Sequence, residues 1–228
     1  MKKPQRLLLE VGMWRSVSVA CGIAVMAMVD QAGLAAEHPR AVQPPKALAL
    51  LVDTSQAMVP HVNAMRTALR SFVREMQPTH EIALIEFGER PTVLTDYTSD
   101  PVRLQRGIER VFARTGTGAY VLDAIVETSK GLQNREGAHP SIVVITAEGP
   151  EFSDRYHRAV VDELTSTGAT LHAFVLSASR EPSLRNAGAR EREFTLALGA
   201  ERTGGTREYL LSNMALEPRL RELAAKLK

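Results

Sequence analysis

The sequence predicts an α/β fold with a doubly wound, mostly parallel sheet and helices on both faces, a Rossmann-like arrangement. Two observations lead to this fold class. Short apolar runs rich in Leu, Val and Ile alternate along the chain with longer segments whose apolar residues recur at helical spacing. Strands that alternate with helices join through right-handed crossovers into parallel sheets. The apolar runs are also continuous, which is typical of strands that are covered on both faces.

Residues 1–36 have the pattern of a secretory signal peptide. Basic residues precede the apolar run from Val17 to Val29 and small residues follow it, so we expect cleavage at Ala35 or Ala36. The run is shorter than the roughly 20 apolar residues that span a bilayer. Retention as an anchor is the alternative. We therefore expect an exported protein, periplasmic or secreted, without a stable membrane span after cleavage.

The rest of the chain is expected to form a tether, 37–46, and one domain, 47–228. The tether is rich in proline and has no hydrophobic periodicity, whereas the domain is long enough to bury a sizeable core. The single cysteine, Cys21, lies in the predicted signal peptide, so we expect a fold without disulfides. Removal of residues 1–36 leaves 24 basic and 24 acidic residues. A net charge of zero argues against nucleic acids and anionic membranes as partners.

The first half of the domain contains three predicted strands and two predicted helices. The strands are expected at 47–52, 81–88 and 92–95. Between the first two strands, apolar residues recur at helical spacing from Val62 to Met76. Asp100 and Pro101 fit the N-cap and the first position of the second helix, which we expect to end at Val111.

The second half repeats the alternation. A glycine-rich turn, "ARTGTGAY", leads into it. Strands are expected at 141–147, at 169–176 and, on an edge, at 206–210, and helices at 121–132, 156–166, 194–198 and 216–227. A long polar segment, 177–190, is expected to precede the short helix. In doubly wound sheets, ligands bind outside the carboxyl ends of the strands. We therefore expect the loops that start at Asp53, Gly116 and Glu148 to meet at one edge.

The order of these elements and four local patterns resemble the von Willebrand factor A-type domain, especially its bacterial exported relatives. The patterns are "LLVDTSQAM", "GTGAYVLDAI", "IVVITAEG" and "TGG", and the resemblance extends from about Lys46 to the end of the chain. It implies a metal-ion-dependent adhesion site in which hard oxygen ligands hold Mg²⁺ and the ion accepts an acidic side chain of a partner. The resemblance thus implies binding of another protein, without enzymatic turnover.

The metal motif is incomplete in this chain. Asp53 and Ser55 match the first two positions of the family's Asp-x-Ser-x-Ser motif, but Ala57 stands at the third. Ala119 stands where the family has a threonine, and Glu148 replaces an aspartate. Mg²⁺ loses affinity when oxygen ligands disappear. We therefore expect a weakened or lost metal site, in which Asp53, Ser55 and Glu148 would hold any ion that binds.

Seven residues are expected to line the binding edge. They are Asp53, Ser55, Gln56, Thr117, Tyr120, Glu148 and Phe152. Thr117 lies near the family's threonine position but out of register with it. Without an ion, Tyr120 and Phe152 are expected to matter most, because aromatic anchors tend to dominate interface energetics.

Other interpretations of these residues remain open. Asp53 and Ser55 are equally suited to cap the helix that follows them. The carboxylate of Asp123 favours a helix N-terminus, which is a structural role. His172 lies in a predicted strand and is expected to be a hydrogen-bonded core histidine.

Two further functional classes are alternatives to binding at this edge. The "DTS" of Asp53 also occurs in the catalytic loop of aspartic-type hydrolases, but those enzymes pair two aspartates on β-rich folds. A structural envelope scaffold would bind through other surfaces, such as the segment 177–190 or the face of Arg66, Arg70 and Arg74. For these arginines we expect a solvated helix face.

Overall fold

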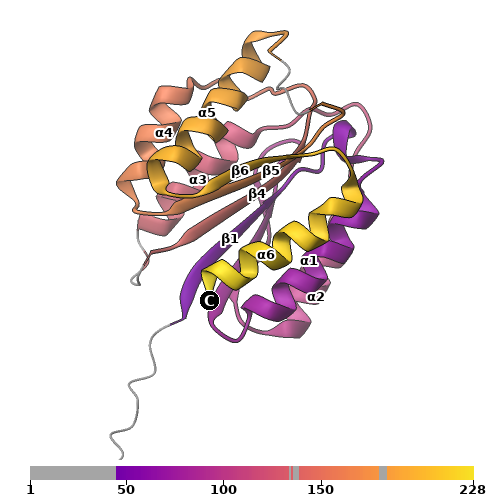
Figure 1. Cartoon of the computed structure of the whole chain (residues 1–228), viewed down its shortest axis with the longest axis vertical. Helices are drawn as coiled ribbons and strands as arrows, with labels where there is room; N and C mark the ends of the chain where they lie inside the picture. Colours follow the sequence, from indigo (N-terminus) through magenta and orange to yellow (C-terminus); the bar gives the residue numbers. More distant parts are fainter. Residues whose placement is uncertain (1–44, 134, 136–138, 180–183) are drawn as a thin grey trace, which may run out of the picture. The chain divides into compact units, whose positions relative to one another are not determined.

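A single six-stranded sheet, in the order β3-β2-β1-β4-β5-β6, forms the centre of the domain in the computed structural model (Figure 1). The structure describes residues 45–133, 135, 139–179 and 184–228. The predicted signal peptide and nearly all of the predicted tether lie outside these residues. The described residues belong to one compact unit, 42–228.

Five strands run parallel and one edge strand runs against them. The strands are β1 (Lys46–Val52), β2 (His80–Glu86), β3 (Thr92–Thr98), β4 (Ser141–Ala147), β5 (Thr170–Leu176) and β6 (Thr206–Leu210). β3 is antiparallel to β2, and its register is irregular. The predicted doubly wound, mostly parallel sheet is therefore confirmed, and the predicted edge strand at 206–210 pairs in parallel with β5.

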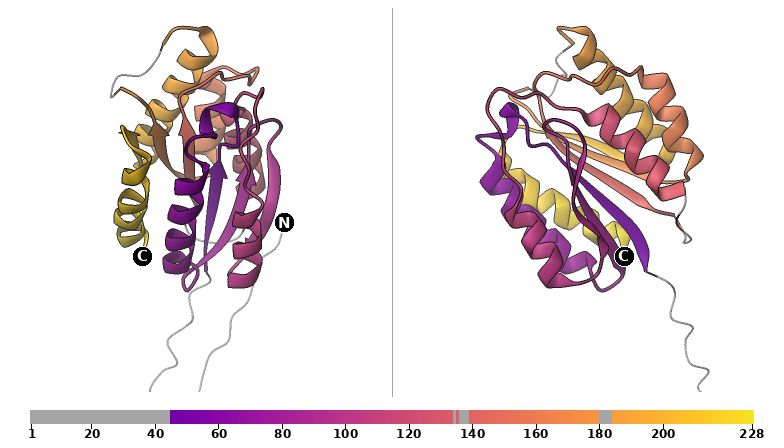
Figure 2. Two further views of the ribbon diagram at one scale, coloured as in Figure 1. Left: turned by 90° about the vertical axis from the view of Figure 1, so that its right-hand side faces the viewer. Right: turned by 180° about the vertical axis from the view of Figure 1, so that it is seen from behind.

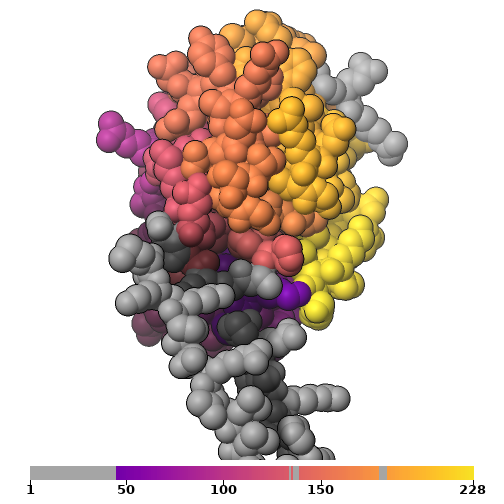
Figure 3. Space-filling model, turned by 90° about the vertical axis from the view of Figure 1, so that its left-hand side faces the viewer, coloured from indigo at the N-terminus to yellow at the C-terminus, as the bar shows by residue number. Residues whose placement is uncertain are grey.

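Helices cover both faces of the sheet, as the sequence predicts. They are α1 (Val62–Met76), α2 (Pro101–Glu109), α3 (Val121–Gln133), α4 (His157–Ser166), α5 (Ala187–Thr203) and α6 (Leu216–Leu227), with short 3₁₀ turns η1 (Gln56–Met58) and η2 (Asn213–Ala215). α1, α2 and α6 pack on one face, and α3, α4 and α5 pack on the other (Figures 1 and 2). The orange surface of α4 and α5 is continuous in the space-filling view (Figure 3).

The buried central strand β1 shows how the sequence builds two cores. Leu48, Leu50 and Val52 point into the core under α1 and α6, whereas Ala49 and Leu51 point into the core under α3. Successive side chains of a strand point to opposite faces, so a strand covered on both sides must be apolar at every position. This requirement explains the continuous apolar run that the sequence shows.

The helix predicted at 194–198 is much longer in the structure. α5 spans 17 residues and begins after Asn186, whose side chain accepts a hydrogen bond from the backbone N–H of Ala189 at 2.8 Å. Arg192, Glu193 and Thr195 are buried on this helix. Its inner face therefore mixes polar and apolar residues, which removes the apolar periodicity that a sequence-based prediction needs.

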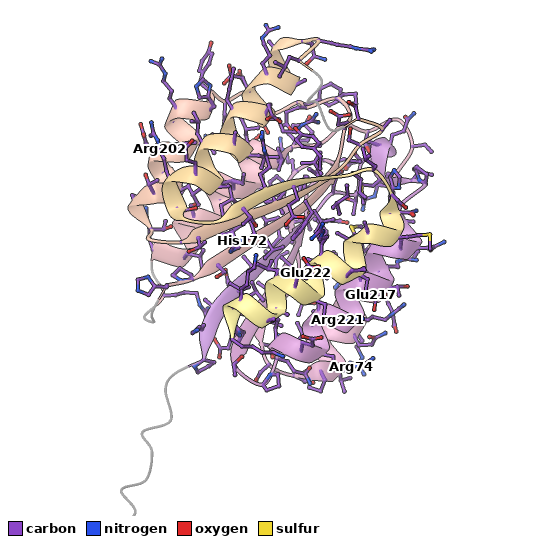
Figure 4. The ribbon with its side chains drawn as sticks, in the orientation of Figure 1. Arg74, His172, Arg202, Glu217, Arg221 and Glu222 are labelled. Carbon is purple, nitrogen blue, oxygen red and sulfur yellow. The ribbon has the colours of Figure 1, made fainter. Side chains whose placement is uncertain are left out.

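The prediction that Arg66, Arg70 and Arg74 form a solvated face is wrong for Arg66. The half-buried Arg66 donates a hydrogen bond from Nε to the carbonyl of Val111 at 2.7 Å, and its guanidinium lies 4.2 Å from the ring centroid of Phe112. Arg66 therefore ties α1 to the segment after α2. Arg74 is exposed near the end of α1 (Figure 4).

His172 is a buried strand residue, as predicted. Its Nδ1 lies 3.0 Å from the hydroxyl of Thr206 on the neighbouring strand, and burial lowers the pKa of its imidazole to about 4. On the surface, Arg221 pairs with Glu217 one turn away on α6 (Figure 4). None of the helices in the described residues is both long and apolar enough to cross a membrane.

Candidate functional site

The candidate site lies at the carboxyl ends of β1 and β4, which are neighbours in the sheet. From β1 the chain crosses to β2 on one side, and from β4 it crosses to β5 on the other. This is the point where strand order reverses, and a crevice for ligands forms there in open α/β sheets. The loops after β1 and β4 border it.

Asp53 follows β1 directly and is fully buried. Its Oδ1 accepts a hydrogen bond from the backbone N–H of Ser55 at 2.7 Å, and its Oδ2 accepts one from the hydroxyl of Thr146 at 2.7 Å and one from the backbone N–H of Ala147 at 3.3 Å. Burial raises the pKa of this carboxyl group, and the hydrogen bonds act against the rise. Asp53 thereby fastens the loop after β1 to the end of β4.

The helix-capping interpretation is wrong for Ser55. Its side chain makes no cap hydrogen bond to the 3₁₀ turn η1 that follows it, and α1 begins only at Val62. The buried Oγ of Ser55 lies near the carboxylate of Asp53 and lowers its pKa, but among the described residues it makes no well-aligned hydrogen bond. Asp53 stabilises the turn through the N–H of Ser55, without reaching the N-terminus of α1.

The loops that start at Asp53 and Gly116 meet, as the sequence predicts. The backbone N–H of Gln56 donates to the carbonyl of Thr117 at 3.3 Å, and the side-chain oxygen of Gln56 accepts from the N–H of Gly116 at 2.8 Å. The hydroxyl of Thr117 donates to the carbonyl of Arg114 at 3.0 Å, inside its own turn. Gln56 therefore helps to hold these two loops together, beside the hydrogen bond from the N–H of Arg114 to the carbonyl of Thr54 at 2.9 Å.

Tyr120 and Phe152 form an aromatic pair at the same edge. Their ring centroids are 6.1 Å apart in an edge-to-face arrangement, and Phe152 remains 54% exposed. The backbone of Ala119 pairs with the loop after β4: its N–H donates to the carbonyl of Pro150 at 2.9 Å and its carbonyl accepts from Phe152 at 2.8 Å. A Cβ on Gly118 would lie 2.4 Å from the ring of Phe152, so the glycine is what allows the ring its present position.

Glu148 and Asp123 are both held by neighbouring residues. The Oε2 of Glu148 accepts a hydrogen bond from the hydroxyl of Ser177 after β5. Asp123 lies in the first turn of α3, as predicted, and forms an ion pair with Arg155. The structure thus brings Glu148 to the predicted edge and gives Asp123 a structural role.

Glu151 and Arg192 belong to this edge but were not predicted from the sequence. The buried Glu151 accepts hydrogen bonds from the N–H groups of Val121 at 3.3 Å and Ser153 at 3.1 Å, and burial raises the pKa of its carboxyl group to about 7. Arg192 is 4% exposed and donates from Nη1 to the carbonyl of Gly149 at 2.8 Å. Glu151 lies in a polar loop, and no sequence pattern distinguishes this buried residue from its solvent-exposed neighbours.

The donor set at this edge does not fit Mg²⁺. Both carboxylate oxygens of Asp53 accept protein hydrogen bonds, and Ser55 Oγ adds one further oxygen. Ala57 supplies no oxygen, and its Cβ would lie 2.7 Å from a Cβ built on Gly149. The part of the chain that the structure describes contains no group of three or more His, Cys, Asp or Glu side chains suited to a metal ion. Mg²⁺ demands octahedral oxygen coordination, and these residues offer too few ligands.

Comparison with known proteins gives a consistent fold. The family model of the von Willebrand factor type A domain matches residues 48–150. The fold is similar to that of the conserved hypothetical protein BatB from Bacteroides thetaiotaomicron, with 16% identity, a TM-score of 0.59 and coverage of 79% of this chain and 99% of that one. It is also similar to the vWF domain of the type V pili tip protein Mfa5 from Porphyromonas gingivalis, with 12% identity, a TM-score of 0.61 and coverage of 82% and 96%.

A third similar structure is the pilus adhesin SpaC from Lactobacillus rhamnosus GG. The identity is 15%, the TM-score is 0.61, and the match covers 81% of this chain and 30% of SpaC. At identities this low, these likenesses concern the fold alone. A comparison with curated proteins gave no match.

Proposed function

The chain contains a von Willebrand factor type A domain, and from this premise we propose that it is an exported, non-enzymatic module that binds another protein at the carboxyl edge of its sheet. The family assignment favours protein–protein interaction in general. The predicted signal peptide supports export.

The aromatic pair of Tyr120 and Phe152 carries the proposal. It lies where strand order reverses, and two backbone hydrogen bonds between Ala119 and the loop after β4 hold it in place. Exposed aromatic side chains on a rigid backbone provide contact area at a low cost in conformational entropy. The half-exposed Phe152 is therefore the anchor that we assign to the partner-binding surface.

Binding at this edge is proposed to need no divalent ion. Asp53, Ser55 and Glu148 are the residues that would hold one, but the carboxylate of Asp53 is buried and hydrogen-bonded by Ser55, Thr146 and Ala147. A metal ion would have to compete with these hydrogen bonds at a buried carboxylate and find further oxygens. The burial of Asp53 also argues against the hydrolase alternative, because a catalytic carboxylate must reach its substrate.

Site-specific photo-crosslinking in cells tests the proposal. A photoreactive residue at position 152 is compared with one at position 102, because Val102 is similarly exposed but lies in the first turn of α2, at the opposite end of the sheet. We expect a protein adduct at position 152 that persists when divalent ions are chelated. Equal adducts at both positions, or none at 152, would contradict the proposed surface, and an adduct lost on chelation would contradict the ion-free mode.

A further inference from the structure

A cavity of about 670 Å³ lies between the loop after β4 and the first turns of α5. It is lined by Glu148, Gly149, Pro150, Arg185, Asn186 and Arg192, among others. Gly149 and Pro150 belong to the same loop as Phe152, so the cavity lies next to the proposed partner-binding surface. Its volume is that of a pocket able to receive a side chain or a short peptide segment.

The guanidinium of Arg192 is the notable group in this cavity. It is 4% exposed and donates one hydrogen bond to a neutral acceptor, the carbonyl of Gly149. Among the residues that the structure describes, no carboxylate oxygen lies within 4.0 Å of a guanidinium nitrogen of Arg192, so Arg192 forms no salt bridge with them. A buried charge is costly unless an opposite charge compensates it.

The carboxylates around Arg192 are directed to other partners. Glu193, its neighbour on α5, pairs with Arg207 and accepts the hydroxyl of Tyr209. Glu151 accepts the N–H groups of Val121 and Ser153, at the start of α3 and in its own loop. Neither acid forms an ion pair with Arg192, although the charge of Arg192 acts on Glu151 at longer range and lowers the pKa of that carboxyl group.

Among the described residues that line the cavity, the balance of charge is positive. Arg185 and Arg192 line it together with one carboxylate, that of Glu148, which accepts the hydroxyl of Ser177. The N-terminus of α5, capped by Asn186, also faces the cavity, and the positive end of the helix dipole adds to the effect.

We propose that this cavity is a carboxylate-binding site in which Arg192 receives an acidic side chain of the bound protein partner. The inference rests on the proposed function and names the chemistry of the partner: an acidic residue close to the apolar residue that packs on Phe152. A planar guanidinium matches a carboxylate in geometry and forms short, charge-assisted hydrogen bonds with it. The buried setting of Arg192 strengthens such a pair relative to one on the surface.

NMR titration of the isotope-labelled domain with a capped tetrapeptide, acetyl-Gly-Glu-Glu-Gly-amide, tests the site in the presence of a chelator. We expect shifts at the backbone amides of Gly149, Asn186 and Ala189, and none with the matched Gln-Gln peptide. Inorganic phosphate serves as a second probe. Shifts with phosphate alone, equal shifts with both peptides, or no shift at these amides up to millimolar peptide would each overturn the proposal.

Substitutions then assign the binding to Arg192. Arg192→Lys keeps the positive charge but loses the planar guanidinium. We expect this variant to bind the acidic peptide about tenfold more weakly. Arg202→Gln is the matched control, since Arg202 is exposed on the same helix and pairs with Asp162 (Figure 4). An unchanged affinity in Arg192→Lys would overturn the role of Arg192. Should that variant fail to fold, Arg185→Gln on the cavity rim must weaken binding by at least about threefold, or the proposal fails.

The outcome is separable from that of the proposed function. A partner adduct at position 152 without any binding of the acidic peptide would leave the edge as the partner site and remove the carboxylate site alone. Peptide binding at Arg192 without an adduct at position 152 would keep the carboxylate site and remove Phe152 as the partner site.

Discussion

The hydroxyl of Thr146 donates a 2.7 Å hydrogen bond to the buried carboxylate of Asp53, across 93 residues of sequence. This contact joins the carboxyl ends of two neighbouring parallel strands at the point where the chain reverses its direction through the sheet. In the sequence, Asp53 has the features of a metal ligand. In the structure its carboxylate joins the ends of β1 and β4 by hydrogen bonds.

Thr146→Val removes this hydrogen bond while keeping the shape of the side chain. The carboxylate of Asp53 then loses one of its donors in a buried place, so we expect a loss of about 1.5–3 kcal/mol in the free energy of unfolding, measured with urea. Thr67→Val on the exposed face of α1 is the control and should change stability by less than about 0.5 kcal/mol. Equal effects in the two variants would contradict the fastening role.

Glu151 should make stability depend on pH. Its pKa rises from 4.5 to about 7 in the folded protein because the carboxyl group is buried. A group whose folded pKa lies above its unfolded pKa stabilises fully below the lower value and loses that contribution as the pH rises through the higher one. Stability from Glu151 is therefore expected to fall between about pH 4.5 and 7, by at most about 3 kcal/mol.

Glu151→Gln provides the measurement, because glutamine keeps the shape and does not ionise. Urea unfolding of both proteins at about pH 4.5, 6 and 8 should show the wild type losing stability relative to the variant as the pH rises. Parallel pH dependences would count against a raised pKa at this position.

Titration with Mg²⁺, Mn²⁺ and Ca²⁺ by calorimetry should give no specific heat up to millimolar ion. The reason is the donor set: Ala57 and Ala119 supply no side-chain oxygen, and both oxygens of Asp53 are already hydrogen-bonded. Asp53→Ala is measured alongside. Heat that the wild type shows and Asp53→Ala lacks would mean that the site still binds an ion.

Gly118→Ala should disturb the aromatic pair without unfolding the domain. The added methyl group would lie 2.4 Å from the ring of Phe152, which is exposed and has room to turn away. We expect the Tyr120–Phe152 ring contact to disappear from NMR spectra and the crosslink at position 152 to weaken. Gly131→Ala in α3 meets no atom within 4 Å and is the control, with an unchanged ring contact and a gain of about 0.5–1 kcal/mol in stability. A ring contact that survives in Gly118→Ala would show that the loop adapts instead.

The sequence was informative wherever a pattern reflects burial on both faces of a strand. The run that contains Leu48 to Val52 predicted a strand covered on both faces, which β1 is, and Asp53 follows directly after it where the loops meet. The sequence could not predict which polar residues are buried by contacts with distant parts of the chain. Arg192 and Glu151 are buried by contacts with distant segments, and their surroundings in the chain are as polar as those of solvated residues. The role of Asp53 likewise depends on Thr146, whose pairing follows from strand order.

The parallel pairing of β1 with β4 also determines when the edge can form. Leu48 lies opposite Ser141, so the chain must close a loop of about half of the domain before the two strands align. Closing long loops costs chain entropy before any contact compensates for it, and folds dominated by such distant pairings form slowly. We expect the Asp53–Thr146 contact, and with it the binding surface, to be among the last parts of the molecule to order. A chain whose residues 141–147 have not yet been released from synthesis therefore lacks the proposed binding edge.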